Sequence, residues 1–64
     1  MDRETFMNMD PYMALSVVNM KLRDEFSSLE DFLASYNIEK EKFEEKMKEI
    51  QYYYNKERNQ FTSK

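Results

Sequence analysis

The chain has 64 residues and a net charge of −3, and it contains no Gly, Cys, His or Trp. A domain of this length buries only about 60% of the surface that its unfolded chain exposes, which leaves little interior for an enclosed ligand pocket. Without Cys and His it lacks thiol nucleophiles, disulfides, thiolate zinc sites and the commonest general base. We therefore expect a protein that is not an enzyme and has no cofactor, no metal site and no small-molecule substrate.

The first nine residues show no sustained apolar periodicity, and they are acidic and polar rather than basic and then apolar, as a signal peptide would be. No apolar run approaches the ~20 residues of a membrane span. The sequence therefore predicts a flexible N-terminal arm over residues 1–9 and a single domain over residues 10–62. It also predicts a cytoplasmic location and no membrane partner.

The first helix is predicted from Pro11 to Asp24 or Glu25. Asp10 is suited to accept hydrogen bonds from the free N–H groups at a helix start, and proline at the next position has no N–H that would go unpaired. Four apolar residues then recur at spacings of 3, 4 and 4, which places them on one helix face: Leu15, Val18, Leu22 and Phe26.

A short second helix is predicted over residues 29–36. Ser27 with Glu30 and Ser28 with Asp31 both fit a capping box, so either serine is a candidate N-cap. Asn37 follows where a helix ends in the left-handed conformation, for which Asn is the usual substitute when Gly is absent. A third helix is predicted from about residue 39 or 40, with an apolar stripe made by Phe43, Met47 and Ile50.

The last part of the chain predicts a β-hairpin. Residues 51–54 are aromatic and favour a strand, residues 55–59 form a polar turn with Asn at both ends, and residues 60–62 form the second strand. Strand alternation places Tyr52, Tyr54 and Phe61 on the inner side and Tyr53 on the other. Because the chain has no Gly, we expect Asn37, Asn55 and Asn59 to hold its turns.

The predicted fold is therefore mainly α, a three-helix domain with a C-terminal β-hairpin in a winged helix-turn-helix-like order. Such tri-helical folds recur with unrelated functions, so the order alone does not indicate DNA binding. The predicted core consists of Leu15, Val18, Leu22, Phe26, Leu29, Phe32, Leu33, Ile38, Phe43, Met47, Ile50, Tyr52, Tyr54 and Phe61.

Polar residues on the first helix are the candidate partner-binding site: Asn19, Lys21 and Arg23. In the alternative interpretation, Arg23 pairs with a neighbouring acid and Asn19 is simply exposed. Met13 and Met20 lie off the main apolar stripe, and methionine adapts well to partner surfaces. These two residues favour an exposed patch for self-association or for another protein.

Nucleic-acid binding is the competing hypothesis. Residues 39–50, which would form the recognition helix, contain five Glu against four Lys, and DNA phosphates would meet net repulsion there. The basic tail offers Tyr53, Lys56 and Arg58 as candidate contacts, with a solvated hairpin turn as the alternative. The charges favour a protein partner or self-association over nucleic acid.

Three segments together resemble the family of short bacterial proteins known as domain of unknown function 4250. They are Asp10-Pro11, the stretch from Asn19 to Leu29 (NMKLRDEFSSL) and the ending Asn59-Gln60-Phe61. The resemblance covers about residues 10–61 and implies a stand-alone bacterial protein, but it supplies no activity or catalytic residue. It makes the stretch from Asn19 to Leu29 the place to look for function.

The sequence thus favours an uncharacterised small bacterial protein that acts as a non-enzymatic protein–protein interaction module. The alternative is a nucleic-acid-binding regulator with a winged helix-turn-helix-like shape. Exposed apolar side chains on the first helix would support the interaction module, and a continuous basic surface around Arg23 and Lys56 would support the regulator.

Overall fold

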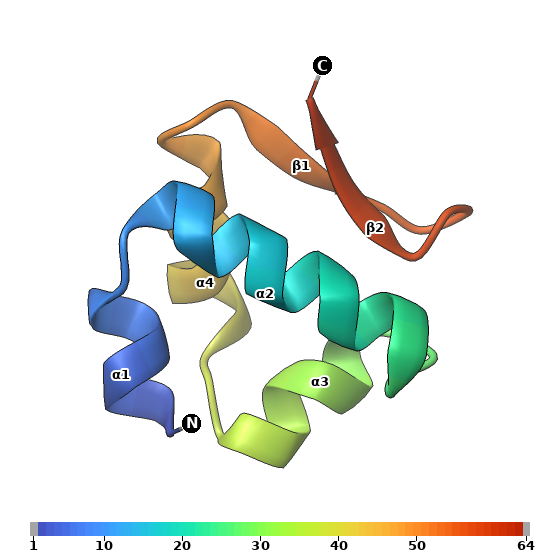
Figure 1. Cartoon of the computed structure of the whole chain (residues 1–64), viewed down its shortest axis with the longest axis horizontal. Coiled ribbons are helices and arrows are strands. Elements are labelled where there is room, and N and C mark those ends of the chain that lie inside the picture. The colour runs from blue at the N-terminus through green and yellow to red at the C-terminus, as the bar shows by residue number, and fades with distance from the viewer. Residues whose placement is uncertain (1, 64) are drawn as a thin grey trace.

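The computed structural model describes residues 2–63 and is mainly helical with a C-terminal hairpin, as predicted. Helix α2 crosses the middle of the molecule, with α3 on one side of it and the hairpin on the other (Figure 1). None of the helices in the described residues is long and apolar enough to span a membrane. The elements are α1 (Arg3–Asn8), α2 (Pro11–Asp24), α3 (Leu29–Tyr36), α4 (Lys40–Lys48), β1 (Tyr52–Asn55) and β2 (Gln60–Ser63).

The segment before residue 10 differs from the prediction, because it contains the helix α1 instead of a loose arm. The side chain of Asp2 caps this helix by accepting a hydrogen bond from the Thr5 N–H at 2.8 Å. Phe6 is fully buried, with its ring centroid 5.4 Å from that of Phe32 and 5.3 Å from that of Phe43. Residues 2–63 therefore form four helices, not three, and the core extends into the N-terminal segment.

The helix ends confirm the local signals in the sequence. Asp10 accepts hydrogen bonds from two backbone N–H groups at the start of α2. Ser28, one of the two candidate serines, is the N-cap of α3 and accepts from the Asp31 N–H at 3.1 Å. Asn37 ends α3 in the left-handed conformation with φ of 55°. Helices α2 and α3 consequently begin and end where the capping residues predict.

The core lies between α2, α3 and α4 and is closed by α1 and the hairpin. Phe6 and Ala14 are buried although neither belongs to the predicted core, while Leu15 and Phe26 are only half-buried and Ile50 stays outside the buried cluster. The other predicted residues are buried or pack against the buried cluster. The buried set is Phe6, Ala14, Val18, Leu22, Leu29, Phe32, Leu33, Ile38, Phe43, Met47 and Phe61.

The hairpin pairs β1 and β2 antiparallel, with Tyr54 opposite Phe61. Tyr52 and Tyr54 pack against the core, as the alternation predicts. Asn59 has positive φ as expected, but the other such position near the hairpin is Gln51, with φ of 62°. Asn55 holds the turn through its side chain instead, accepting a hydrogen bond from the Arg58 N–H at 3.1 Å.

Candidate functional site

Asn19 connects α2 to the hairpin through a pair of side-chain hydrogen bonds. Its Nδ2 donates to the carbonyl oxygen of Phe61 at 3.1 Å, and its Oδ1 accepts from the N–H of the same residue at 2.7 Å. The amide therefore pairs with Phe61 as a neighbouring strand would. Gln60 adds a third bond, from its Nε2 to the Asn19 carbonyl oxygen at 2.9 Å. Asn19 was predicted to face a partner, and its amide is instead used inside the fold.

Asn59 makes the second connection between the hairpin and α2. Its Nδ2 donates to the carbonyl oxygens of Leu22 and Phe26, both at 3.0 Å, and so satisfies two acceptors at the C-terminal end of α2. Its Oδ1 accepts from the Tyr54 hydroxyl at 2.6 Å, and this hydroxyl in turn accepts from the Leu29 N–H at 3.4 Å. The residues that carry the resemblance to a family thus hold the hairpin on the helices.

Lys21 and Arg23 both pair with acids close to them in the chain. Lys21 Nζ lies 2.8 Å from Glu25 Oε2, and this hydrogen bond raises the pKa of Lys21. Arg23 binds Asp24 through Nε at 2.9 Å and Nη2 at 3.0 Å. That pair raises the pKa of Arg23 and lowers the pKa of Asp24. Both pairs lie at the surface, where solvent screens an ion pair and it contributes little to stability.

The three predicted partner residues therefore do not form one site. Asn19 faces β2, Lys21 is half-buried beside Glu25, and only Arg23 extends into solvent. Arg23 belongs to a wide exposed surface of α2 whose residues lie three and four apart along the helix and so share one face. We call the residues of this surface the outer face of α2: Tyr12, Met13, Ser16, Met20 and Arg23.

Three large apolar side chains stand exposed on the outer face of α2. Tyr12 is 60% exposed, Met13 61% and Met20 46%. No other large apolar side chain between residues 2 and 63 is exposed. The prediction that Met13 and Met20 lie off the buried stripe is confirmed.

The hairpin carries the three residues predicted as nucleic-acid contacts, Tyr53, Lys56 and Arg58. Lys56 and Arg58 are exposed in the turn, while Tyr53 is half-buried in β1 and lines a hollow beside α4. This hollow has a volume of about 470 Å³. It is lined by Glu41, Glu44, Glu45 and Lys48 of α4 and by Tyr52, Tyr53, Tyr54 and Phe61 of the hairpin. The face of α4 next to the hairpin thus carries more acid than base, which opposes binding of phosphates there.

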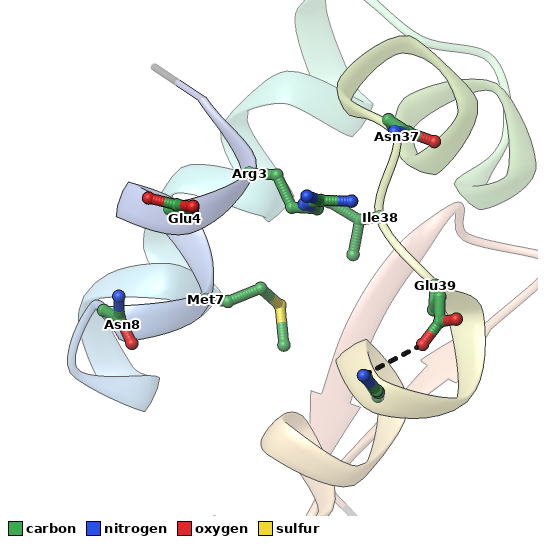
Figure 2. Close-up of a pocket in the computed structure, with 8 residues that line it drawn as sticks. Arg3, Glu4, Met7, Asn8, Asn37, Ile38 and Glu39 are labelled. Carbon is green, nitrogen blue, oxygen red and sulfur yellow. Dashed lines mark ion pairs between the residues drawn. The ribbon is translucent and has the colours of Figure 1, made fainter.

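A second hollow, of about 560 Å³, lies between α1 and the start of α4 (Figure 2). Met7 extends into it from α1, and Arg3 of the same helix also lines it. Glu39 neutralises Lys42 at its far wall, with 3.2 Å between Oε2 and Nζ. The hollow is open and has acids and bases in equal number, so its charge selects no ligand class.

The shifted pKa values among the described residues belong to surface ion pairs and one helix cap. No group of three or more acidic side chains among residues 2–63 is placed to hold a metal ion. Four side chains have shifted pKa values, and each shift follows from a visible hydrogen bond: Asp2 at the cap of α1, and Lys21, Arg23 and Asp24 in ion pairs. These are structural pairs at the surface, unlike the buried, unpaired groups of catalytic sites.

The fold and its surfaces define a small, mainly helical domain with a hairpin held on its central helix by asparagine side chains. The family model described as "Domain of unknown function (DUF4250)" matches residues 8–61, and the chain belongs to this family. No curated protein and no solved structure matches the chain. The outer face of α2 and the hollow beside α4 lie within the matched residues, whereas Arg3, Glu4 and Met7 of the larger hollow lie outside them.

Proposed function

We propose that the protein is a non-enzymatic protein–protein interaction module that docks through the outer face of α2. The observation that carries this proposal is the grouping of Tyr12, Met13 and Met20, since the exposed large apolar side chains of residues 2–63 all lie on this one helix. Single exposed apolar residues are ordinary, but a group of them on one surface marks a contact site.

The side-chain types on this face suit protein binding. Tyrosine is enriched among the residues that dominate binding energy, and arginine shares that property. Methionine is flexible and polarisable, so it fits partner surfaces of different shape. The inner side of the same helix is committed to the fold through Asn19 and the buried Val18 and Leu22, so the two sides of α2 have separate roles.

A non-enzymatic role is supported by what the chain offers for chemistry. It has no His and no Cys, and the shifted pKa values of its described residues come from surface pairs and a helix cap. The two hollows are open to solvent, and both are lined by acids and bases. These observations leave the outer face of α2 as the basis for a function in binding.

Capture from cell extract tests the proposal with a matched pair of variants. Met13→Glu places a charge on the outer face of α2, and Ala34→Glu places the same charge at an exposed apolar residue of α3. We expect wild type and Ala34→Glu to retain the same protein, quantified by mass spectrometry, and Met13→Glu to lose it. If wild type and both variants capture the same proteins, or none captures any, the outer face of α2 does not bind another protein of the extract.

A nucleic-acid-binding regulator is the second candidate. It is favoured by the helix–turn–helix–hairpin order and by the exposed cations Lys56 and Arg58 at the hairpin turn. It is opposed by the three glutamates of α4 that line the hollow beside the hairpin. A salt-dependent gel shift that disappears in a Lys56→Glu/Arg58→Glu variant would support it, and unchanged binding by that variant would exclude the hairpin as the contact.

A further inference from the structure

Four residues of the outer face of α2 follow the spacing of a helix–helix seam. Met13, Ser16, Met20 and Arg23 lie 3, 4 and 3 residues apart, which is the alternation that aligns side chains along a packed helix pair. All four are exposed in the folded chain. The seam is therefore available to a second helix along most of the length of α2.

This seam is complementary to itself when it is turned end for end. Its midpoint lies between Ser16 and Met20, so antiparallel pairing places the large Met20 beside the small Ser16 of a second copy. Met13 then lies along the aliphatic stem of Arg23 of the second copy, which offers apolar surface. We infer that the partner of this face is a second copy of the chain, with the two α2 helices antiparallel. This inference rests on the proposed function.

Charge selects the antiparallel direction. The guanidinium of Arg23 comes near Asp10 of the second copy, whose two cap hydrogen bonds both use Oδ2 and leave Oδ1 available. The Arg23 pair with Asp24 uses Nε and Nη2 and leaves Nη1 for this contact. Parallel pairing would instead oppose Arg23 to Arg23 and Asp10 to Asp10. The antiparallel arrangement also aligns the two helix dipoles favourably.

The contact is small, so the dimer is weak. One 14-residue helix presents the seam, and stable complexes usually bury about 800 Å² on each partner. Helices packed through a small residue lie about 8 Å apart, which brings facing Cα atoms to within disulfide distance. Because the chain has no Cys, a single introduced Cys reports this contact without any background disulfide.

Disulfide exchange between two single-Cys variants tests the inference. Ser16→Cys and Met20→Cys are mixed in a glutathione buffer, and Ser35→Cys, an exposed serine of α3, is the control. Antiparallel pairing predicts that the mixed disulfide, which joins one variant to the other, exceeds either single-variant disulfide by about fivefold or more, because only that pair faces directly. Random collision predicts a twofold excess and yields equal to the control, which would overturn the inference. Predominant single-variant disulfides indicate parallel pairing and also overturn it.

A charge variant and its control complete the test. Arg23→Glu in both single-Cys chains sets two acids against each other at each end of the pair, so the mixed disulfide should fall to the level of the Ser35→Cys control. Arg58→Glu makes the same change at the hairpin turn and should leave the yield unchanged. If Met13→Glu abolishes capture of another protein while no specific disulfide forms, the second copy is refuted and the interaction module stands. If a specific disulfide forms while Met13→Glu changes no capture, the partner is the second copy alone.

Discussion

Replacing Asn19 by Ala removes the connection between α2 and β2, and its cost follows from the structure. The change deletes two hydrogen bonds, of 3.1 and 2.7 Å, and leaves the N–H and C=O groups of Phe61 without their partners. An unpaired, partly buried backbone group costs about 1–3 kcal/mol. Both groups lie at the edge of β2, where water reaches them in part, so we expect a total loss of about 2–3 kcal/mol. A domain of this length has only roughly 3–10 kcal/mol of stability.

Thermal unfolding followed by circular dichroism measures this loss. About 2–3 kcal/mol corresponds to a fall in Tm of roughly 10–20 °C for a domain of this size. Asn8→Ala, at an exposed position at the end of α1, is the matched control and should leave Tm nearly unchanged. Hydrogen exchange of the Phe61 amide should also become faster in Asn19→Ala than in the control. If the two variants have the same Tm, Asn19 does not hold the hairpin on α2. Asn19 would then be a candidate partner-binding residue again.

Three further changes test the fold. Leu22→Ala removes a buried side chain from α2 and should lower the free energy of unfolding by about 2–5 kcal/mol in urea titration; an unchanged midpoint would place the wrong face of α2 in the core. Asn37→Ala should lower it by about 1 kcal/mol and Asn37→Gly should not, because φ is 55° at this position; equal losses would contradict the left-handed cap. The hydrogen bond from the Thr5 N–H lowers the pKa of Asp2 in the folded state. The Asp2 carboxylate therefore stabilises the fold at pH values above its ordinary pKa of about 3.9. This stabilisation is lost as the pH falls through the lower pKa of the folded state. Asp2→Asn should therefore flatten the dependence of Tm on pH below about 4, and an unaltered curve would show that the cap is not formed.

Much of the fold could be predicted because its signals are local. Asp10, Ser28 and Asn37 lie next to the backbone groups that they cap, so a few residues of sequence contain the whole interaction. The hairpin was predicted for a similar reason, since strand alternation and a polar turn lie within one short segment. Helix α1 escaped prediction because it is six residues long and is stabilised mainly by Phe6 packing on Phe32 and Phe43, far along the chain.

The candidate site shows the same division between local and distant partners. Asn19 bonds to Phe61, which lies 42 residues further along the chain, and no helix periodicity contains that contact. The one available signal was the family resemblance itself, because it joined Asn19 and Asn59-Gln60-Phe61, the residues that meet in space. The exposure of Met13 and Met20 was predicted correctly, since it depends only on their position around α2.

The inferred antiparallel dimer requires the outer face of α2 to contact a second copy of the chain. A series of ¹H–¹⁵N NMR spectra, recorded from dilute protein to about 1 mM, tests this contact directly. This range detects a dissociation constant near 1 mM, which corresponds to a binding free energy of about −4.1 kcal/mol. The antiparallel dimer predicts that shifts with concentration concentrate on Met13, Ser16, Met20 and Arg23 and are absent in Met13→Glu. Shifts that concentrate on the hairpin turn or beside α4 instead, or spectra that do not change with concentration, would contradict it.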